Sequence, residues 1–169
     1  SAISQVKSVT GRFQYIEGSH GCIGIVDYAH TPDALLNVLQ TIHGLKRPEQ
    51  KIITVIGCGG DRDKGKRPLM AEIAFKNSDT VIFTSDNPRT EQPDQIIDDM
   101  MAGVPPGRTR EVIRNTSRAA AIQTACALLQ PGDIVLVAGK GHETYQDIAG
   151  EKLAFSDSVE LQKHLQITS

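Results

Sequence analysis

A short polar segment, Asp86, Asn87, Pro88 and Arg89, follows the apolar run at residues 81–83 after Thr84 and Ser85. The run contains β-branched and aromatic residues, which is typical of a buried strand, whereas Asp, Asn and Pro favour turns. The sequence therefore predicts a strand that ends abruptly and presents charged and amide side chains at its carboxyl end. In open α/β sheets, ligands bind at that end. A capped turn with a solvated arginine is the alternative interpretation.

Three other polar segments follow apolar runs in the same way, at residues 27–32, 57–66 and 139–143. The loops that follow the strands of a parallel sheet project from one edge, so we expect all four segments to lie together. Purely structural loops would not need mixed charges in four separate places, and we predict a ligand site at this edge. Its charged, amide and histidine residues are Asp27, His30, Asp61, Arg62, Asp63, Lys64, Asp86, Asn87, Arg89, Lys140, His142 and Glu143.

The glycine-rich segment has the spacing of a nucleotide-binding P-loop, G-x-x-x-x-G-K, from Gly60 to Lys66. A P-loop continues with Ser or Thr, whose hydroxyl binds magnesium, but here Arg67 follows. A small nucleotide-binding enzyme with a degenerate P-loop is therefore a weak alternative. We expect instead that Gly59 and Gly60 allow a close approach to a neighbouring loop or to a ligand, with at least one of them at positive φ.

Other common catalytic patterns are missing from the sequence. The pair His142 and Glu143 lacks the second histidine of a zinc-binding helix, and no His and Cys residues have metal-ligand spacing. The G-x-S-x-G pattern of a nucleophile elbow is also missing. We therefore predict no metal ligands and no catalytic residue of its own for this chain.

Apolar runs alternate with amphipathic segments along the chain. We expect strands at residues 13–17, 22–28, 51–57, 81–85, 110–114 and 133–138, with the first two forming a hairpin. We expect helices from an N-cap at Thr31 to Gly44, from 66 to about 77, from 93 to 101, from an N-cap at Thr116 to about 129, and from 157 to 165. This order predicts an α/β, Rossmann-like fold: a mainly parallel sheet with helices on both faces. The 169 residues fit a single domain.

The composition narrows the classes of partner. The net charge is −2 and there is no Trp, so we expect neither a nucleic-acid surface nor a polybasic membrane patch. No apolar run is long enough to span a bilayer. The three cysteines, Cys22, Cys58 and Cys126, are far apart and form no C-x-x-C pair. They are typical of reduced core residues in a cytoplasmic protein.

Four segments, in order, resemble the C-terminal domain of the Mur ligases. They are D-Y-A-H-T-P-D-A at 27–34, G-C-G-G-D-R-D-K-G-K-R-P at 57–68, D-N-P-R at 86–89 and G-K-G-H-E at 139–143. Within the family they are most similar to the enzymes that add meso-diaminopimelate to UDP-N-acetylmuramoyl-L-Ala-D-Glu in peptidoglycan synthesis. The resemblance implies an enzyme, a ligase that uses ATP and Mg²⁺. Its UDP-sugar-binding and central ATPase domains are absent from the 169 residues, so we expect the isolated chain to be inactive.

The resemblance also implies roles for single residues. Two of them, Asp27 and His30, would face ATP. Meso-diaminopimelate has two amino-acid ends, so Arg62 and Arg89 could each bind a carboxylate and Glu143 an ammonium. Some family members add lysine, which has no distal carboxylate, and these members differ at the arginine of D-N-P-R. The full set of implied contacts to the amino acid is Arg62, Asp86, Asn87, Pro88, Arg89, Gly139 and Glu143. The alternative from another class is a stand-alone Rossmann-like module that binds amino acids or regulates a partner.

Overall fold

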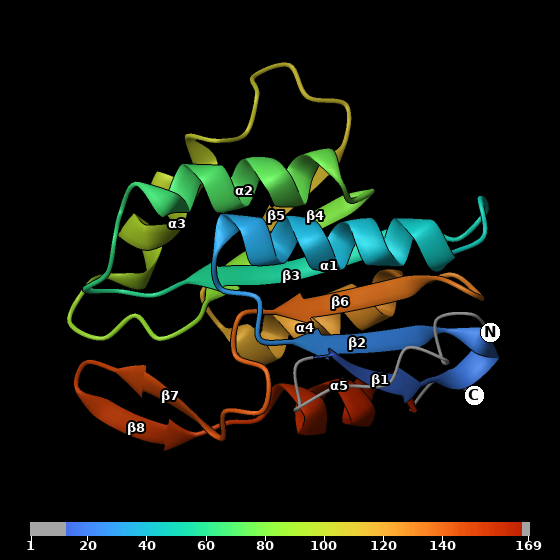
Figure 1. The fold of residues 1–169 in the computed structure, drawn as a ribbon. Helices are drawn as coiled ribbons and strands as arrows, with labels where there is room; N and C mark the ends of the chain where they lie inside the picture. Colours follow the sequence, from blue (N-terminus) through green and yellow to red (C-terminus); the bar gives the residue numbers. More distant parts are fainter. Residues whose placement is uncertain (1–12, 167–169) are drawn as a thin grey trace.

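The computed structural model describes residues 13–166, and these are built around a six-stranded sheet in the order β1-β2-β6-β3-β4-β5 (Figure 1). The strand β1 is antiparallel to β2, and the other neighbours are parallel. At the centre, Val55 lies opposite both Ile82 and Val137. The strands are β1 (Phe13–Glu17), β2 (Ile23–Asp27), β3 (Ile52–Cys58), β4 (Thr80–Ser85), β5 (Glu111–Arg114) and β6 (Ile134–Ala138).

Helices cover both faces of the sheet (Figure 1). The helices α1 (Pro32–Leu45), α2 (Lys66–Lys76) and α3 (Pro93–Met101) cover one face, and α4 (Arg118–Leu128) and α5 (Asp157–Leu165) cover the other. Each layer has its own apolar core, because both faces of the central strands carry apolar side chains. The predicted α/β, Rossmann-like fold is confirmed. The predicted single domain also includes residues 1–12 and 167–169, which lie outside the described residues.

Two predicted helix ends were wrong. Thr31 does cap α1, since its Oγ1 accepts a hydrogen bond from the Ala34 amide at 3.2 Å. However, α1 continues through Gly44 to Leu45, and a side chain at Gly44 would meet nothing within 4 Å. The N-cap of α4 is Ser117 and not Thr116, because Asn115 Oδ1 accepts from the Ser117 amide and so completes a turn one residue later.

A second, small sheet was not predicted. Its strands β7 (Tyr145–Ile148) and β8 (Glu151–Ala154) form an antiparallel hairpin. Ala149 and Gly150 form the turn, with φ angles of 54° and 85°. The hairpin lies beyond the carboxyl ends of the parallel strands, next to the predicted ligand edge (Figure 1). Among residues 13–166, no helix is both long and apolar enough to cross a membrane.

Candidate functional site

A cavity of about 400 Å³ lies at the carboxyl ends of the parallel strands. This volume is in the range of small-molecule sites. It is lined by Tyr28, His30, Gly57, Cys58, Gly59, Arg62, Asp63, Lys66, Met70, Asp86, Asn87, Arg89, Gly139 and Glu143. The loops after β2, β3, β4 and β6 all contribute, so the predicted meeting of four polar segments at one edge is confirmed.

Some predicted residues lie outside the lining. The Asp27 carboxylate is buried and accepts from the Ala29 amide at 2.8 Å, which holds the chain between β2 and α1. Pro88 packs against Gly60 instead. Two other charged residues of the edge contact neighbouring side chains: the Asp61 carboxylate accepts a hydrogen bond from Thr90 Oγ1, and Lys64 Nζ lies 3.8 Å from Glu91 Oε1. His142 is exposed, and Lys140 is fully buried.

Several residues that line the cavity were not expected from the sequence. Tyr28 and Cys58 belong to the polar segments, but neither carries a charge. Met70 follows Lys66 by four residues on α2, so both face the cavity from one side of the helix. Burial raises the pKa of the Cys58 thiol to about 12, so this thiol stays protonated near neutral pH.

Arg89 is held in an uncommon backbone conformation. Its φ is 51°, in the left-handed region that non-glycine residues rarely adopt. Its amide donates to the Asp147 carbonyl at 2.9 Å, and its carbonyl accepts from the Ala149 amide at 2.8 Å. The hairpin therefore fixes the backbone of Arg89. The guanidinium Nη1 then donates to the Gly60 carbonyl at 2.8 Å, which places the side chain across the glycine-rich loop.

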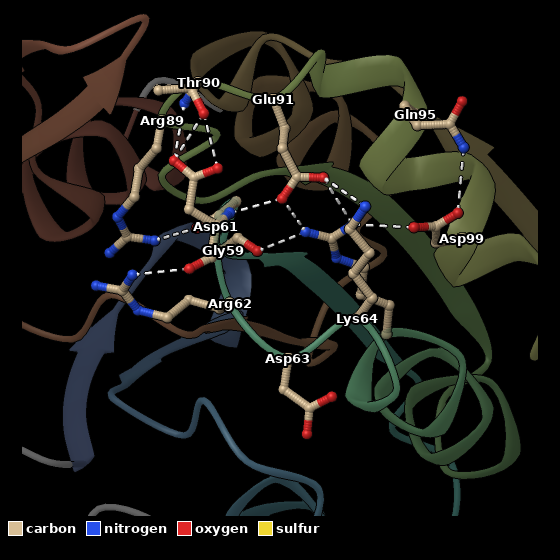
Figure 2. Close-up of polar contacts among 12 residues, drawn as sticks. Gly59, Asp61, Arg62, Asp63, Lys64, Arg89, Thr90, Glu91, Gln95 and Asp99 are labelled. Atoms are coloured by element: carbon tan, nitrogen blue, oxygen red, sulfur yellow. Dashed lines mark hydrogen bonds and ion pairs between the residues drawn. The ribbon is translucent and has the colours of Figure 1, made fainter.

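Two arginines lie side by side at the cavity. A Cβ atom built on Gly59 would lie 2.9 Å from Arg89 Nη1 and 3.5 Å from Arg62 Cγ. Within residues 13–166 neither guanidinium forms an ion pair, and their hydrogen bonds go to backbone carbonyls. Figure 2 shows both side chains beside the loop that carries Gly59 and Asp61. Their charges are therefore available to a bound anion.

Gly60 confirms the expected close approach. A Cβ at this position would lie 1.9 Å from the Pro88 carbonyl oxygen, and the Gly60 amide donates to the Asn87 carbonyl at 2.8 Å. The expected positive φ was wrong, because neither Gly59 nor Gly60 has one. Asp61 has it instead, with φ at 55°, since its carboxylate bonds to Thr90 Oγ1 at 2.7 Å and its amide to Glu91 (Figure 2).

A buried ion network joins the glycine-rich loop to the segment after β4. Arg67 is 1% exposed and donates to Glu91 at 2.7 Å, to Asp99 at 2.9 Å and to the Gly59 carbonyl at 3.0 Å. A P-loop needs a hydroxyl at the position of Arg67, and here that position is a buried structural cation. This arrangement argues against the degenerate P-loop.

The same network predicts a pH dependence of stability. Hydrogen bonds from Arg67 and then from the Asp61 amide lower the pKa of Glu91 to about 2. A carboxylate whose pKa is lowered on folding stabilises the fold above its unfolded pKa of about 4.3, and this contribution is lost as the pH falls toward 2. In urea unfolding, Glu91→Gln should therefore lower the free energy of unfolding at pH 6, and this loss should shrink as the pH falls from about 4 to 2. The exposed Glu72→Gln should show little deficit throughout. A Glu91→Gln deficit that does not vary with pH would contradict the prediction.

Together, the fold and the cavity define an α/β domain with a cavity of small-molecule size that is lined by charged side chains. The sequence profile of the Mur ligase glutamate ligase domain matches residues 11–141. The match covers well over half of the chain, and the chain belongs to the Mur ligase family. The resemblance inferred from the four segments is therefore confirmed.

Individual relatives are similar over nearly the whole chain. A protein from Bacteroides fragilis named UDP-N-acetylmuramoyl-L-alanyl-D-glutamate--2,6-diaminopimelate ligase is 52% identical over 167 residues, 99% of this chain and 34% of that protein. A relative of the same name from Phocaeicola vulgatus is 55% identical, over 92% of this chain and 32% of its own length. A solved structure of a ligase of that name superposes with a TM-score of 0.86 at 43% identity, over 95% of this chain and 32% of its own. The chain spans about a third of the relatives that it matches.

Proposed function

We propose that this chain is the domain of an ATP-dependent ligase that binds meso-diaminopimelate and orients it for addition to UDP-N-acetylmuramoyl-L-Ala-D-Glu. The observation that carries the proposal is the pair Arg62 and Arg89. Both line one cavity, and within the described residues neither is neutralised by a carboxylate. The nearby buried Arg67, by contrast, is neutralised by Glu91 and Asp99.

The charges around the cavity suit a diamino diacid. Two guanidinium groups can bind carboxylates, and Asp86 and Glu143 supply acceptors for an ammonium. An amino acid with only one carboxylate would leave one arginine of the pair unmatched. The names of the relatives, which specify 2,6-diaminopimelate, support the same substrate.

The chemistry then depends on domains outside this chain. In the Mur ligase reaction, ATP converts the substrate carboxylate into an acyl phosphate, and the amine of the incoming amino acid attacks the acyl carbon. A C–N bond forms, phosphate leaves and the amine loses a proton. This domain would contribute orientation and a charged environment. We infer that the exposed His30, and Asp27 beneath its loop, face ATP when the domains close.

Magnesium does not fit a resident site in this domain. Within residues 13–166, no group of three or more His, Cys, Asp or Glu side chains is arranged to hold a metal ion. We therefore assign no step to a magnesium ion held by these residues. Any such ion would accompany ATP.

The proposal can be tested on the isolated chain and on the full-length ligase that contains this domain, called the parent ligase below. The parent enzyme, given ATP, Mg²⁺ and the UDP-linked dipeptide, should release phosphate with meso-diaminopimelate and far more slowly with lysine. The isolated chain should form no product, and calorimetric titration with magnesium-ATP should show no tight binding. Equal use of both amino acids would contradict the proposed substrate. Binding of an amino acid without any ligation by the parent protein would favour the regulatory module.

Gly60 offers a test of the loop that carries the arginines. In Gly60→Ala the new methyl would force the Pro88 carbonyl to move, because 1.9 Å is far below van der Waals contact. Arg89 would move with it, and kcat/KM for meso-diaminopimelate should fall on the order of 10- to 100-fold. The control Gly44→Ala enters open space in α1 and should stabilise the chain by about 0.5–1 kcal/mol. A Gly60→Ala enzyme with lower stability but unchanged kinetics would contradict the prediction.

A further inference from the structure

The side chain of Lys140 lies directly beneath the cavity, and the reaction outlined above gives it no role. It is fully buried and does not line the cavity, so it cannot contact a ligand there. Its ammonium donates to Asn87 Oδ1 at 2.8 Å, to Asp86 Oδ1 at 3.2 Å and to Glu143 Oε1 at 3.2 Å. A lysine has three N–H donors, and these three acceptors match them all. The acceptors come from two loops, one after β4 and one after β6.

The orientation of the Asn87 amide follows from its partners. Asn87 Oδ1 accepts from Lys140 Nζ and also from the Asp147 amide at 2.9 Å. Both partners can only donate, so the oxygen of Asn87 must face them and its NH₂ group must point the other way. Asn87 lines the cavity, and within residues 13–166 its NH₂ group has no acceptor and is not sealed from solvent. The amide therefore presents a donor to the cavity.

The two carboxylates are oriented in the same manner. Lys140 binds one oxygen of Asp86 and one oxygen of Glu143. Within the described residues, the second oxygen of each carboxylate accepts no hydrogen bond, and both side chains line the cavity. One buried cation thus leaves one donor and two acceptors directed at a ligand.

We propose that Lys140 is the positioning residue that sets Asn87, Asp86 and Glu143 to bind a zwitterionic amino-acid end. The carboxylate of such an end accepts from the Asn87 NH₂ group, and its ammonium donates to the free oxygens of Asp86 and Glu143. This inference rests on the proposed function, because the ligand is the incoming diamino acid. Removal of Lys140 would leave the Asn87 amide oriented by the Asp147 N–H alone, and it would leave two carboxylates close together without a cation.

The test uses the parent ligase with Lys140→Met, Asn87→Asp and, as a control, Lys163→Met, which changes an exposed lysine on α5. Lys140→Met should raise KM for meso-diaminopimelate about tenfold or more, which corresponds to about 1.4 kcal/mol, and should leave KM for ATP nearly unchanged. Asn87→Asp keeps an oxygen for Lys140 and for the Asp147 amide, so the unfolding midpoint should stay close to that of the unsubstituted enzyme. Its KM for meso-diaminopimelate should nevertheless rise by about tenfold or more, because an oxygen replaces the donor. The control should match the unsubstituted enzyme.

The possible outcomes separate a positioning role of Lys140 from a purely structural one. Parallel losses in stability and in the KM of both substrates for Lys140→Met would show a merely structural lysine and overturn the inference. An Asn87→Asp enzyme with normal KM would overturn the inferred amide orientation, and this variant decides alone if Lys140→Met does not fold. If the unsubstituted ligase does not accept meso-diaminopimelate, the proposed function itself fails. If it accepts this substrate and both variants keep its KM, only the inference about Lys140 fails.

Discussion

Replacing Arg89 by alanine in the parent ligase should lower kcat/KM for meso-diaminopimelate by about 30-fold or more. The removal of one partner from a desolvated charge pair costs on the order of 2–5 kcal/mol, and about 1.36 kcal/mol corresponds to a tenfold change in rate. Lysine lacks the distal carboxylate, so kcat/KM for lysine, which we expect to be low already, should change far less. Arg89→Lys should not restore activity, because an ammonium cannot supply the planar pair of donors. Measurement of kcat/KM for both amino acids checks this result.

The structure also gives Arg89 a bracing role, which the experiment must separate from substrate binding. Its Nη1 atom donates to the Gly60 carbonyl, so alanine would remove a contact that holds the glycine-rich loop. If bracing were its only role, kcat/KM for both amino acids would fall together. The exposed Arg47→Ala, far from the cavity, is the matched control and should change neither. A selective loss with diaminopimelate is therefore the result that assigns Arg89 to the distal carboxylate.

The parallel sheet could be predicted from the sequence because its strands are buried on both faces. Residues 52–57 are apolar except for Thr54, and every one of them is buried. The hairpin of β7 and β8 gave no such signal. All four residues of β8 are exposed, so neither a buried run nor an alternating pattern marks them. The Ala149–Gly150 turn lacks the Asn-Gly or Asp-Gly pair that most strongly indicates a hairpin.

The meeting of four loops at one cavity could be predicted from the sequence, but the contacts within those loops could not. Which loops meet follows from the parallel topology, and this much was recognisable from the four motifs. The pairing of Arg67 with Glu91 could not be predicted, because 24 residues separate them and buried arginines are uncommon. The burial of Lys140 was not predicted either, because buried lysines are as uncommon as buried arginines. Charged residues in a polar loop are expected at the surface, and only the three acceptors around Lys140 explain why this one lies inside.

Loss of the buried pair Arg118 and Asp157 should have the largest effect on stability. Both side chains are 0% exposed, and Arg118 binds both carboxylate oxygens of Asp157 at 2.7 Å. Arg118→Leu would leave a buried carboxylate without a partner, so the free energy of unfolding of the 169-residue chain should fall by about 3–5 kcal/mol. Urea unfolding measures this loss. The exposed Arg114→Leu, which also breaks an ion pair to aspartate, should cost about 1 kcal/mol or less.

Arg118 should affect the site as well as stability, because it also donates to the carbonyls of Ser85 and Ala138, at 2.9 and 3.2 Å. These residues directly precede Asp86 and Gly139 at the cavity. The double variant Arg118→Leu with Asp157→Leu removes both charges and should recover much of the lost stability, since no unpaired ion remains. It should not recover activity in the parent ligase, because the carbonyls of Ser85 and Ala138 still lack the hydrogen bonds from Arg118. A double variant that is no more stable than Arg118→Leu alone would show that the lost contacts to the carbonyls, and not the unpaired carboxylate, account for the destabilisation.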